Sequence, residues 1–378
     1  MGYSFIVYAA AYTISIFFIV VYQKLAKNKT AKYSALILSM AIPIILAGVR
    51  YDVGTDYFQY QKIYYSISTI KASDYIQLYF DSKIRYEIGY YLINRCAKVL
   101  FNSVYSVAFI SEGITIFFIY KGLLYYKEKI NLGIGLFIYY MLFYQDTFNI
   151  VRQCISMAII FYAYRYILEK KLVKYLFFVI LGMLFHISSL AFAALYLMNF
   201  IDILEIKGIA EGNNNRSKQV KNFVINIIMI FAISFFILYS TQIVNMIMNL
   251  SFFQDYSIYQ GKTGKTVSFI RVLYSLVPII IIFINKKYIQ SYQVFVYTLL
   301  LQVPLYFTVT ISKWMAGRFV PYIQIILCFL LPLCISGNKK NRKLIIILTI
   351  VWCLFLYIYD YIILGSGETY PYKTFFMY

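Results

Sequence analysis

Long apolar stretches alternate with short polar ones over the whole length of the chain. An apolar helix needs about 20 residues to cross the hydrocarbon core of a membrane. Windows of that length predict about twelve transmembrane spans, at residues 3–22, 33–49, 104–124, 132–146, 149–168, 173–186, 188–201, 222–242, 267–285, 290–311, 319–336 and 343–364. The alternating pattern of a barrel strand is absent, and a helix in lipid satisfies its own backbone hydrogen bonds. The pattern therefore predicts an all-α, polytopic transmembrane helical bundle that forms a single membrane domain over residues 1–378.

Lysine-rich loops predict the orientation of these spans, because positively charged loops stay on the cytoplasmic side. Lysines follow the spans at 3–22, 104–124, 149–168, 267–285 and 319–336. These loops share one side, with both termini outside, only if the segment Tyr86–Phe101 does not cross. That segment is short and charged, so we expect an amphipathic or re-entrant helix. If it did cross, two early loops would change sides. Residues 50–103 are therefore predicted to form one long external segment, and residues 243–266 a second external loop.

Composition agrees with a membrane protein. The chain is 62% hydrophobic and only 13% charged, whereas soluble domains average about 25% charged residues. The net charge of +20 would suggest nucleic acid in a soluble protein, but here the lysine loops account for it, and no nucleic-acid partner is expected. The chain has five scattered cysteines and one histidine, so we expect no Cys/His zinc site. No cofactor is expected either.

Polar residues gather on the predicted outer side, although the orientation was derived from lysines elsewhere. They include Arg50, Asp52, Asp56, Tyr57, Glu112, Asn149, Arg152, Gln153, His186, Arg271 and Arg318. Lysines follow the positive-inside rule, whereas these arginines break it. An arginine within a membrane costs about 2.5–3.5 kcal/mol on insertion scales, and its guanidinium binds carboxylate or phosphate through two parallel hydrogen bonds. The pattern indicates an anionic ligand at the outer leaflet, such as a lipid-linked phosphate or pyrophosphate.

Tyrosine is unusually abundant, with 42 residues. Many are expected at the membrane interfaces, but one cluster is denser than an interface needs, at Tyr51, Tyr57, Phe58, Tyr60, Tyr64 and Tyr65. Tyrosine has an apolar face and a polar tip, which suits a sugar ring.

Four segments resemble the signatures of a known family. The segment RYDVGTDYFQY, Arg50–Tyr60, resembles the first signature of the EpsG branch of Wzy-type polysaccharide polymerases. NIVRQCISMAI at Asn149–Ile159 is similar to the second signature, FHISSL at Phe185–Leu190 to the third, and GRFVPY at Gly317–Tyr322 to a weaker fourth. The order and spacing of these segments also fit, so the resemblance covers most of the chain.

The resemblance implies an integral glycosyltransferase of the bacterial cytoplasmic (inner) membrane with a GT-C-like fold. Its donor and acceptor would be oligosaccharide repeat units carried on undecaprenyl pyrophosphate, joined on the outer face to build capsule, O-antigen or exopolysaccharide. Membrane lipid and a chain-length regulator protein are its implied partners, and neither a metal nor a nucleotide sugar is needed.

Within this reaction, Arg50, Arg152 and Arg318 are expected to bind pyrophosphate, with Tyr57, Asn149, Gln153 and Arg271 lining the substrate site. The base for the acceptor hydroxyl would be Asp52, Asp56, Glu112 or His186. Structural alternatives stay open at this stage. Arg50, Asp52 and Asp56 could form a local ion-pair cluster, and Arg152 could pair with Asp146 or Glu112. His186 could be a core histidine bonded to Ser189, and Arg318 could anchor the interface.

Two other functions share parts of this pattern. An O-antigen ligase would use the same donor and a similar arginine-rich outer face, so only the signatures favour a polymerase. A flippase for lipid-linked oligosaccharide would need polar residues along a path through the bilayer, whereas here they gather at one face.

Overall fold

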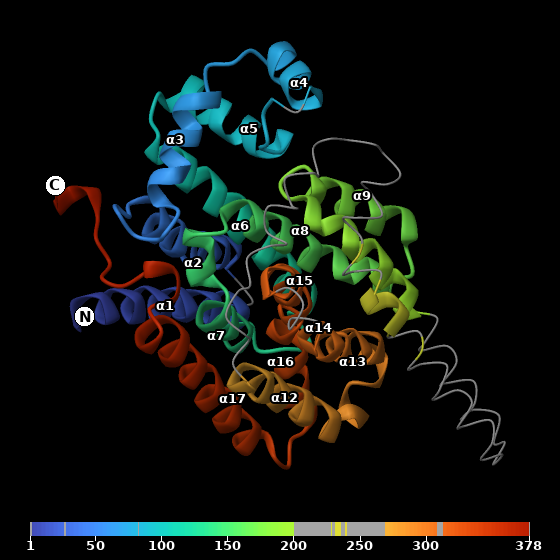
Figure 1. Ribbon diagram of the computed structural model, residues 1–378. Coiled ribbons are helices and arrows are strands. Elements are labelled where there is room, and N and C mark those ends of the chain that lie inside the picture. Colours follow the sequence, from blue (N-terminus) through green and yellow to red (C-terminus); the bar gives the residue numbers. More distant parts are fainter. Residues whose placement is uncertain are drawn as a thin grey trace.

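The computed structural model is a bundle of helices of unequal length (Figure 1). It describes residues 2–25, 28–81, 83–199, 269–307 and 313–377, with 228, 231–235 and 239, and only the backbone of 269–272, 304, 306–307 and 313–317. The described residues form helices and no strands, which confirms the all-α prediction for this part of the chain. The α-helices are α1 Gly2–Lys24, α2 Lys29–Gly48, α3 Tyr57–Ile67, α4 Ala72–Phe80, α5 Ile88–Cys96, α6 Tyr105–Tyr125, α7 Leu132–Leu142, α8 Val151–Leu168, α9 Leu172–Met183, α12 Phe269–Ile284, α13 Gln293–Leu300, α14 Gln302–Phe307, α15 Lys313–Gln324, α16 Leu327–Gly337 and α17 Arg342–Tyr357.

Helix α1 shows how the sequence divides a membrane helix into two faces. Its buried residues recur every three or four positions and include Tyr8, Tyr12 and Ser15. Phe5 and Phe17 lie on the exposed side. The polar tips therefore face protein partners and the apolar rings face outward, which is the arrangement a lipid environment favours.

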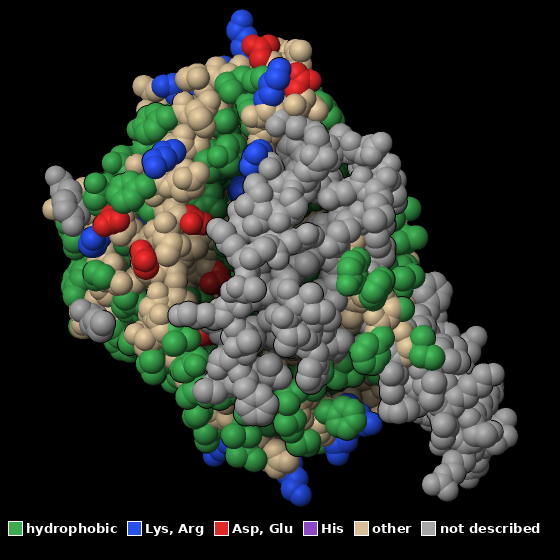
Figure 2. All heavy atoms as spheres, viewed as in Figure 1, with side chains coloured by type: hydrophobic (Ala, Val, Ile, Leu, Met, Phe, Trp, Pro, Cys, Tyr) green, Lys and Arg blue, Asp and Glu red, His purple; other side chains and the backbone are tan. Residues whose placement is uncertain are grey.

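Two helices form the centre of the bundle. Of the 18 residues of α8, only four are not buried, and α16 is buried along almost its whole length. Helix α6 packs against both α2 and α8, and α16 packs against α7. Lysine and arginine side chains are visible on the upper part and at the lower edge of the molecule in Figure 2.

The twelve predicted spans are confirmed only in part. Five helical stretches are long and apolar enough to cross a membrane, at Gly2–Lys24, Lys29–Gly48, Tyr105–Tyr125, Arg318–Gly337 and Arg342–Ile363. Others are shorter than the prediction. Span 188–201 is represented by the 3-10 helix η3, Ile187–Leu197, and span 290–311 is broken between α13 and α14. Pro304 lies in the first turn of α14, where its missing N–H is tolerated, so it marks a new helix start. Span 222–242 lies almost wholly, and loop 243–266 wholly, outside the described residues.

Segment 50–103 is folded around a small core of its own. Helices α3, α4 and α5 lie together at the top of Figure 1, followed by a π-helical turn, Ala97–Phe101. The rings of Tyr75 and Tyr91 stack with centroids 3.8 Å apart, and this core continues onto Val107 of α6 and Val151 of α8. Helix α5 has nine residues, too few for a span. The external position of this segment stays a prediction.

The C-terminal strap, defined here as residues 365–377, returns to the beginning of segment 50–103. The Tyr51 N–H donates to the Lys373 carbonyl (2.9 Å), and the Phe375 N–H donates to the Val49 carbonyl (3.2 Å). Tyr372 donates its hydroxyl to the Leu46 carbonyl (2.6 Å). The strap thus connects the last part of the described chain to the C-terminal end of α2.

Candidate functional site

The first signature forms a tight loop that the strap supports. The N–H groups of Gly54 and Thr55 donate to the carbonyls of Glu368 (3.1 Å) and Gly367 (3.2 Å). Gly54 has φ +102°, and a Cβ there would lie 2.8 Å from the Phe148 carbonyl oxygen. Only glycine fits this backbone and this close approach. The loop therefore has one defined position against the segment between α7 and α8.

Arg50 is held by main-chain groups rather than by a carboxylate. Its Nη1 donates to the Ala47 carbonyl (3.0 Å), Nη2 approaches the Phe148 carbonyl (3.4 Å), and the guanidinium lies 4.6 Å from the centroid of the Phe148 ring. Asp52 pairs instead with Lys373 (2.7 Å). The alternative of a local ion-pair cluster of Arg50, Asp52 and Asp56 is therefore wrong among the described contacts.

Glu112 lies behind Arg50. Its side chain is buried in the first half of α6, and Thr147 and Arg50 are the groups that interact with its carboxyl. The pairing with Arg152 considered from the sequence is not formed. Because Glu112 is enclosed, it is remote from solvent.

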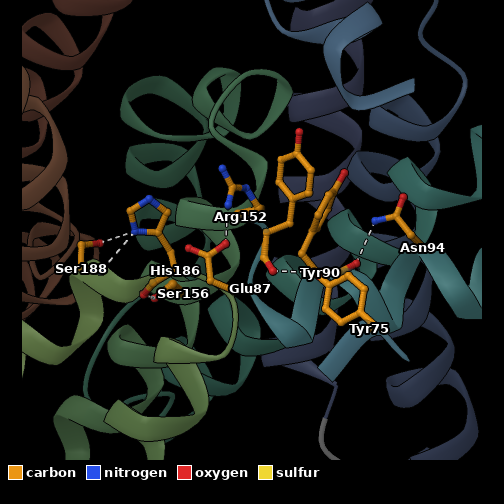
Figure 3. A network of polar contacts seen from close by, with 9 residues as sticks. Tyr75, Glu87, Tyr90, Asn94, Arg152, Ser156, His186 and Ser188 are labelled. Atoms are coloured by element: carbon orange, nitrogen blue, oxygen red, sulfur yellow. Dashed lines mark hydrogen bonds and ion pairs between the residues drawn. The ribbon is translucent and has the colours of Figure 1, made fainter. Parts of the chain in front are cut away.

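Arg152 forms an ion pair with Glu87, a residue the sequence analysis did not select (Figure 3). Glu87 precedes α5 and is buried, whereas the Arg152 side chain is 25% exposed. The Gly89 N–H donates a hydrogen bond to the Leu184 carbonyl (2.7 Å). This bond fixes the N-terminal end of α5 near the third signature. The predicted pairing of Arg152 with Glu112 is thus wrong, whereas the alternative of Asp146 stays a prediction. In the sequence, the available signal for Glu87 was its place directly after Tyr86. The Tyr86 ring also contacts Arg152.

Asp56 interacts electrostatically with Arg152 of this pair. It is half-buried at the N-terminus of α3. Burial raises the pKa of its carboxyl, and the positive charge of Arg152 opposes that rise. A half-buried carboxylate beside an arginine has access to ligand and an altered proton affinity, which are the properties of a candidate base.

His186 is buried, as one alternative had it. Its imidazole bonds to Ser188, whereas Ser189 donates its N–H only to the His186 carbonyl (3.2 Å). The Ser188 N–H donates to His186 Nδ1 (3.3 Å), and the Ser188 hydroxyl lies 2.7 Å from the same nitrogen and 2.9 Å from the Tyr322 hydroxyl. Because Nδ1 accepts, the neutral ring carries its proton on Nε2. In this tautomer His186 is suited to donate a hydrogen bond rather than to act as a base.

The second and fourth signatures meet beside His186. Gln153 donates to the Arg318 carbonyl (2.9 Å), and both Arg318 and Arg152 act electrostatically on the imidazole of His186. We call Asp56, Glu87, Arg152, His186 and Arg318 the arginine cluster. The four signatures, far apart in the sequence, therefore contribute to one region of the molecule.

Asn149 lies between the 3-10 helix Tyr144–Phe148 and α8. Its Oδ1 accepts from the Thr55 hydroxyl (2.9 Å), and its Nδ2 donates to the Gly367 carbonyl (3.0 Å). Both ends of the amide therefore join the first signature to the strap. The side chain of Arg271 lies outside what the structure describes.

Comparison with known proteins identifies a family. A family model described as the EpsG family matches residues 33–374, which confirms the resemblance of the four signatures. No curated protein and no solved structure matches the chain. The GT-C-like fold therefore stays a prediction. Among the described residues, no three histidine, cysteine or acidic side chains come together as metal ligands.

Proposed function

Because this chain belongs to the EpsG family of polysaccharide-polymerase-like membrane proteins, we propose that it is a glycosyltransferase acting on undecaprenyl-pyrophosphate-linked repeat units. It would join one unit to the next on the outer face of the bacterial cytoplasmic membrane. The observation that carries the proposal is the arginine cluster. There, a partly exposed Arg152 oriented by Glu87 lies close to Asp56, His186 and Arg318.

The roles within the reaction follow from charge and access. The acceptor hydroxyl attacks the anomeric carbon of the donor, and the bond to the lipid pyrophosphate breaks with its electron pair going to that leaving group. Arg152 and Arg318 stabilise the negative charge that develops there. Glu87 is a positioning residue, because it holds the guanidinium of Arg152.

Asp56 is the proposed base, since each of the other candidate bases is enclosed or bound to another group of the protein. Asp52 pairs with Lys373 of the strap, Glu112 is enclosed with Arg50, and the Nδ1 of His186 accepts from Ser188. Asp56 would take the proton from the acceptor hydroxyl. Arg50 anchors the loop that presents Asp56.

Deletion of the gene tests the function. We expect the deletion strain to lose polymerised surface glycan and to retain single repeats on their lipid carrier, with polymer restored from a plasmid. Gel analysis of surface glycan and of extracted lipid-linked repeats measures both. Loss of a flippase would instead leave no externally displayed repeat. Unchanged polymer, or the flippase pattern, would contradict the proposal.

The raised pKa of Asp56 predicts an acid limb in the pH profile. A base must be ionised, so activity should fall as pH decreases through a pKa above the usual value for aspartate, about 3.9. Asp56→Asn should lower the rate by about 10²–10⁴-fold and remove that limb. Purified protein in nanodiscs, supplied with lipid-linked repeats from the deletion strain, provides the assay. Asp52→Asn should retain the limb even if its rate falls. An acid limb that survives in Asp56→Asn would assign the base to another group.

A further inference from the structure

An open groove lies between α1 and α17, and α7 packs against both of these helices (Figure 1). Its volume is about 260 Å³, close to the lower limit of small-molecule sites, about 300 Å³. Apart from Asn131, Thr349 and one glycine, the lining consists of apolar side chains. The Thr349 hydroxyl already donates to the Ile345 carbonyl (2.8 Å). The groove therefore fits an apolar occupant.

The wall formed by α1 and α7 is fixed by contacts within the protein. Gln23 Nε2 donates to the Ile130 carbonyl (2.6 Å), and Gln23 Oε1 accepts from the Leu132 N–H (3.0 Å). Gly133 allows a close approach of the two helices, because a Cβ there would lie 2.7 Å from Val20 Cγ2. These contacts form the groove without help from an occupant.

Three cations continue the groove beyond its apolar lining. Lys24 lies four residues after Val20 on the same face of α1, which places it one turn, about 5.4 Å, beyond the lining. On α17, Arg342 and Lys343 precede the lining residue Ile346 by four and three residues. All three cations are exposed, and none forms an ion pair with an acid within the described part of the chain.

The cations of the two helices gather at one end of the groove. Gln23 joins the end of α1 to the start of α7, as described above. Lys129, just before α7, donates to the Tyr292 hydroxyl (2.9 Å), and Asn338, just before α17, donates to Asn285 (2.8 Å). Asn285 and Tyr292 flank the short turns between α12 and α13. The end of α1 and the starts of α7 and α17 therefore share one end of the bundle.

This arrangement matches the order of groups in a phospholipid, whose phosphate lies just beyond its acyl chains. The cations belong to the lysine-rich loops that are predicted to be cytoplasmic, and basic sites between membrane helices on that side suit anionic headgroups. A second copy docked here about a two-fold axis would bring the same cations together, and like charges repel. Charge complementarity thus favours an anionic lipid over a second copy of the chain.

The groove is separate from the candidate functional site. The strap contacts α1 near its beginning, through Ser4 and Tyr8. The groove involves the later part of the same helix, at Ile16 and Val20. A lipid in the groove therefore lies toward the opposite end of α1 from the strap and the first signature.

We propose that the groove binds one anionic glycerophospholipid, with an acyl chain between α1 and α17 and the phosphate at Lys24, Arg342 and Lys343. The inference goes beyond the proposed function and does not depend on it. By filling the groove, the lipid adds apolar contacts that hold α17 against the bundle.

Native mass spectrometry of the purified full chain tests the site, with phosphatidylglycerol and phosphatidylcholine of identical acyl chains as probes. We expect one phosphatidylglycerol per chain to bind more tightly than phosphatidylcholine. Lys24→Gln combined with Lys343→Gln should weaken phosphatidylglycerol about 25-fold, or about fivefold for each cation, and leave phosphatidylcholine unchanged. Ile350→Trp should weaken both lipids, because Ile350 lines the groove and is 39% exposed, so a larger side chain occupies the groove without entering the core.

Lys121→Gln combined with Lys174→Gln is the matched control. Both lysines are exposed and belong to loops or helix ends on the same predicted side, but they lie on α6 and α9 and do not line the groove. This pair should bind phosphatidylglycerol as the wild type does.

Four results would overturn the site. Equal affinity of the wild type for the two lipids would remove the headgroup preference, and an equal loss in the control pair would reduce it to net charge. Displacement of phosphatidylglycerol by an equal concentration of undecaprenyl phosphate would assign the groove to the lipid carrier. A dimer that Ile350→Trp dissociates would assign it to a second copy. Each of these results leaves the deletion test of the polymerase unaffected.

Discussion

Arg152→Lys is expected to reduce polymer formation by about 10²–10³-fold while the protein inserts and accumulates normally. Lysine keeps the positive charge and can still pair with Glu87, so segment 50–103 should stay docked. It lacks the planar fork that binds two phosphate oxygens at once, and a single lost donor at a developing charge has effects of this size. Gel analysis of surface glycan in a complemented deletion strain, with protein quantified in the membrane fraction, measures the result.

Arg165→Lys is the matched control for this substitution. Arg165 lies on the same helix, surrounded by the rings of Tyr125, Tyr162 and Tyr166, and has no place in the arginine cluster. We expect it to retain polymer. Full-length polymer from well-expressed Arg152→Lys would exclude Arg152 from the reaction.

Truncation after Leu364, which removes the C-terminal strap, should abolish polymer formation. Truncation deletes the carbonyls that accept from Tyr51, Gly54 and Thr55 and the ammonium that pairs with Asp52. Without them the loop that presents Asp56 loses its support on one side, although the helices before the strap remain. Loss of surface polymer and faster proteolysis within residues 50–56 are the two expected readouts.

A shorter truncation separates the strap from a general effect of shortening. Removal of residues 376–378 leaves the bonds of Gly367, Glu368, Lys373 and Phe375 in place. This variant should keep polymer and a protected loop. If the longer truncation also kept both, the strap would have no part in positioning the site.

The sequence grouped the candidate residues better than it predicted their contacts. The lysine loops predict the side of the membrane on which each span ends, and this was sufficient to group Arg50, Arg152, His186 and Arg318. The partner of Arg152 could not be predicted in the same way. Glu87 is 65 residues away, and its approach depends on how Gly89 packs on Leu184, a tertiary contact that leaves no local pattern.

Helix lengths were the weaker part of the prediction for a similar reason. Apolar composition marks a stretch as compatible with lipid but does not say whether it is one helix or two. Ile187–Leu197 is as apolar as its neighbours, yet it forms a 3-10 helix that packs against α9 and α8. Asp52 is a further case, because its partner Lys373 lies 321 residues away.

The strap would also delay the proposed activity during biosynthesis. Lys373 leaves the ribosome 321 residues after Asp52, a delay of about 15–60 s at ordinary rates of bacterial and eukaryotic translation. The intervening helices must enter the membrane before the first signature loop can be held in place. A nascent chain would therefore carry the arginines and Asp56 on the membrane surface without the geometry to use them, and each molecule would become active in a single late step.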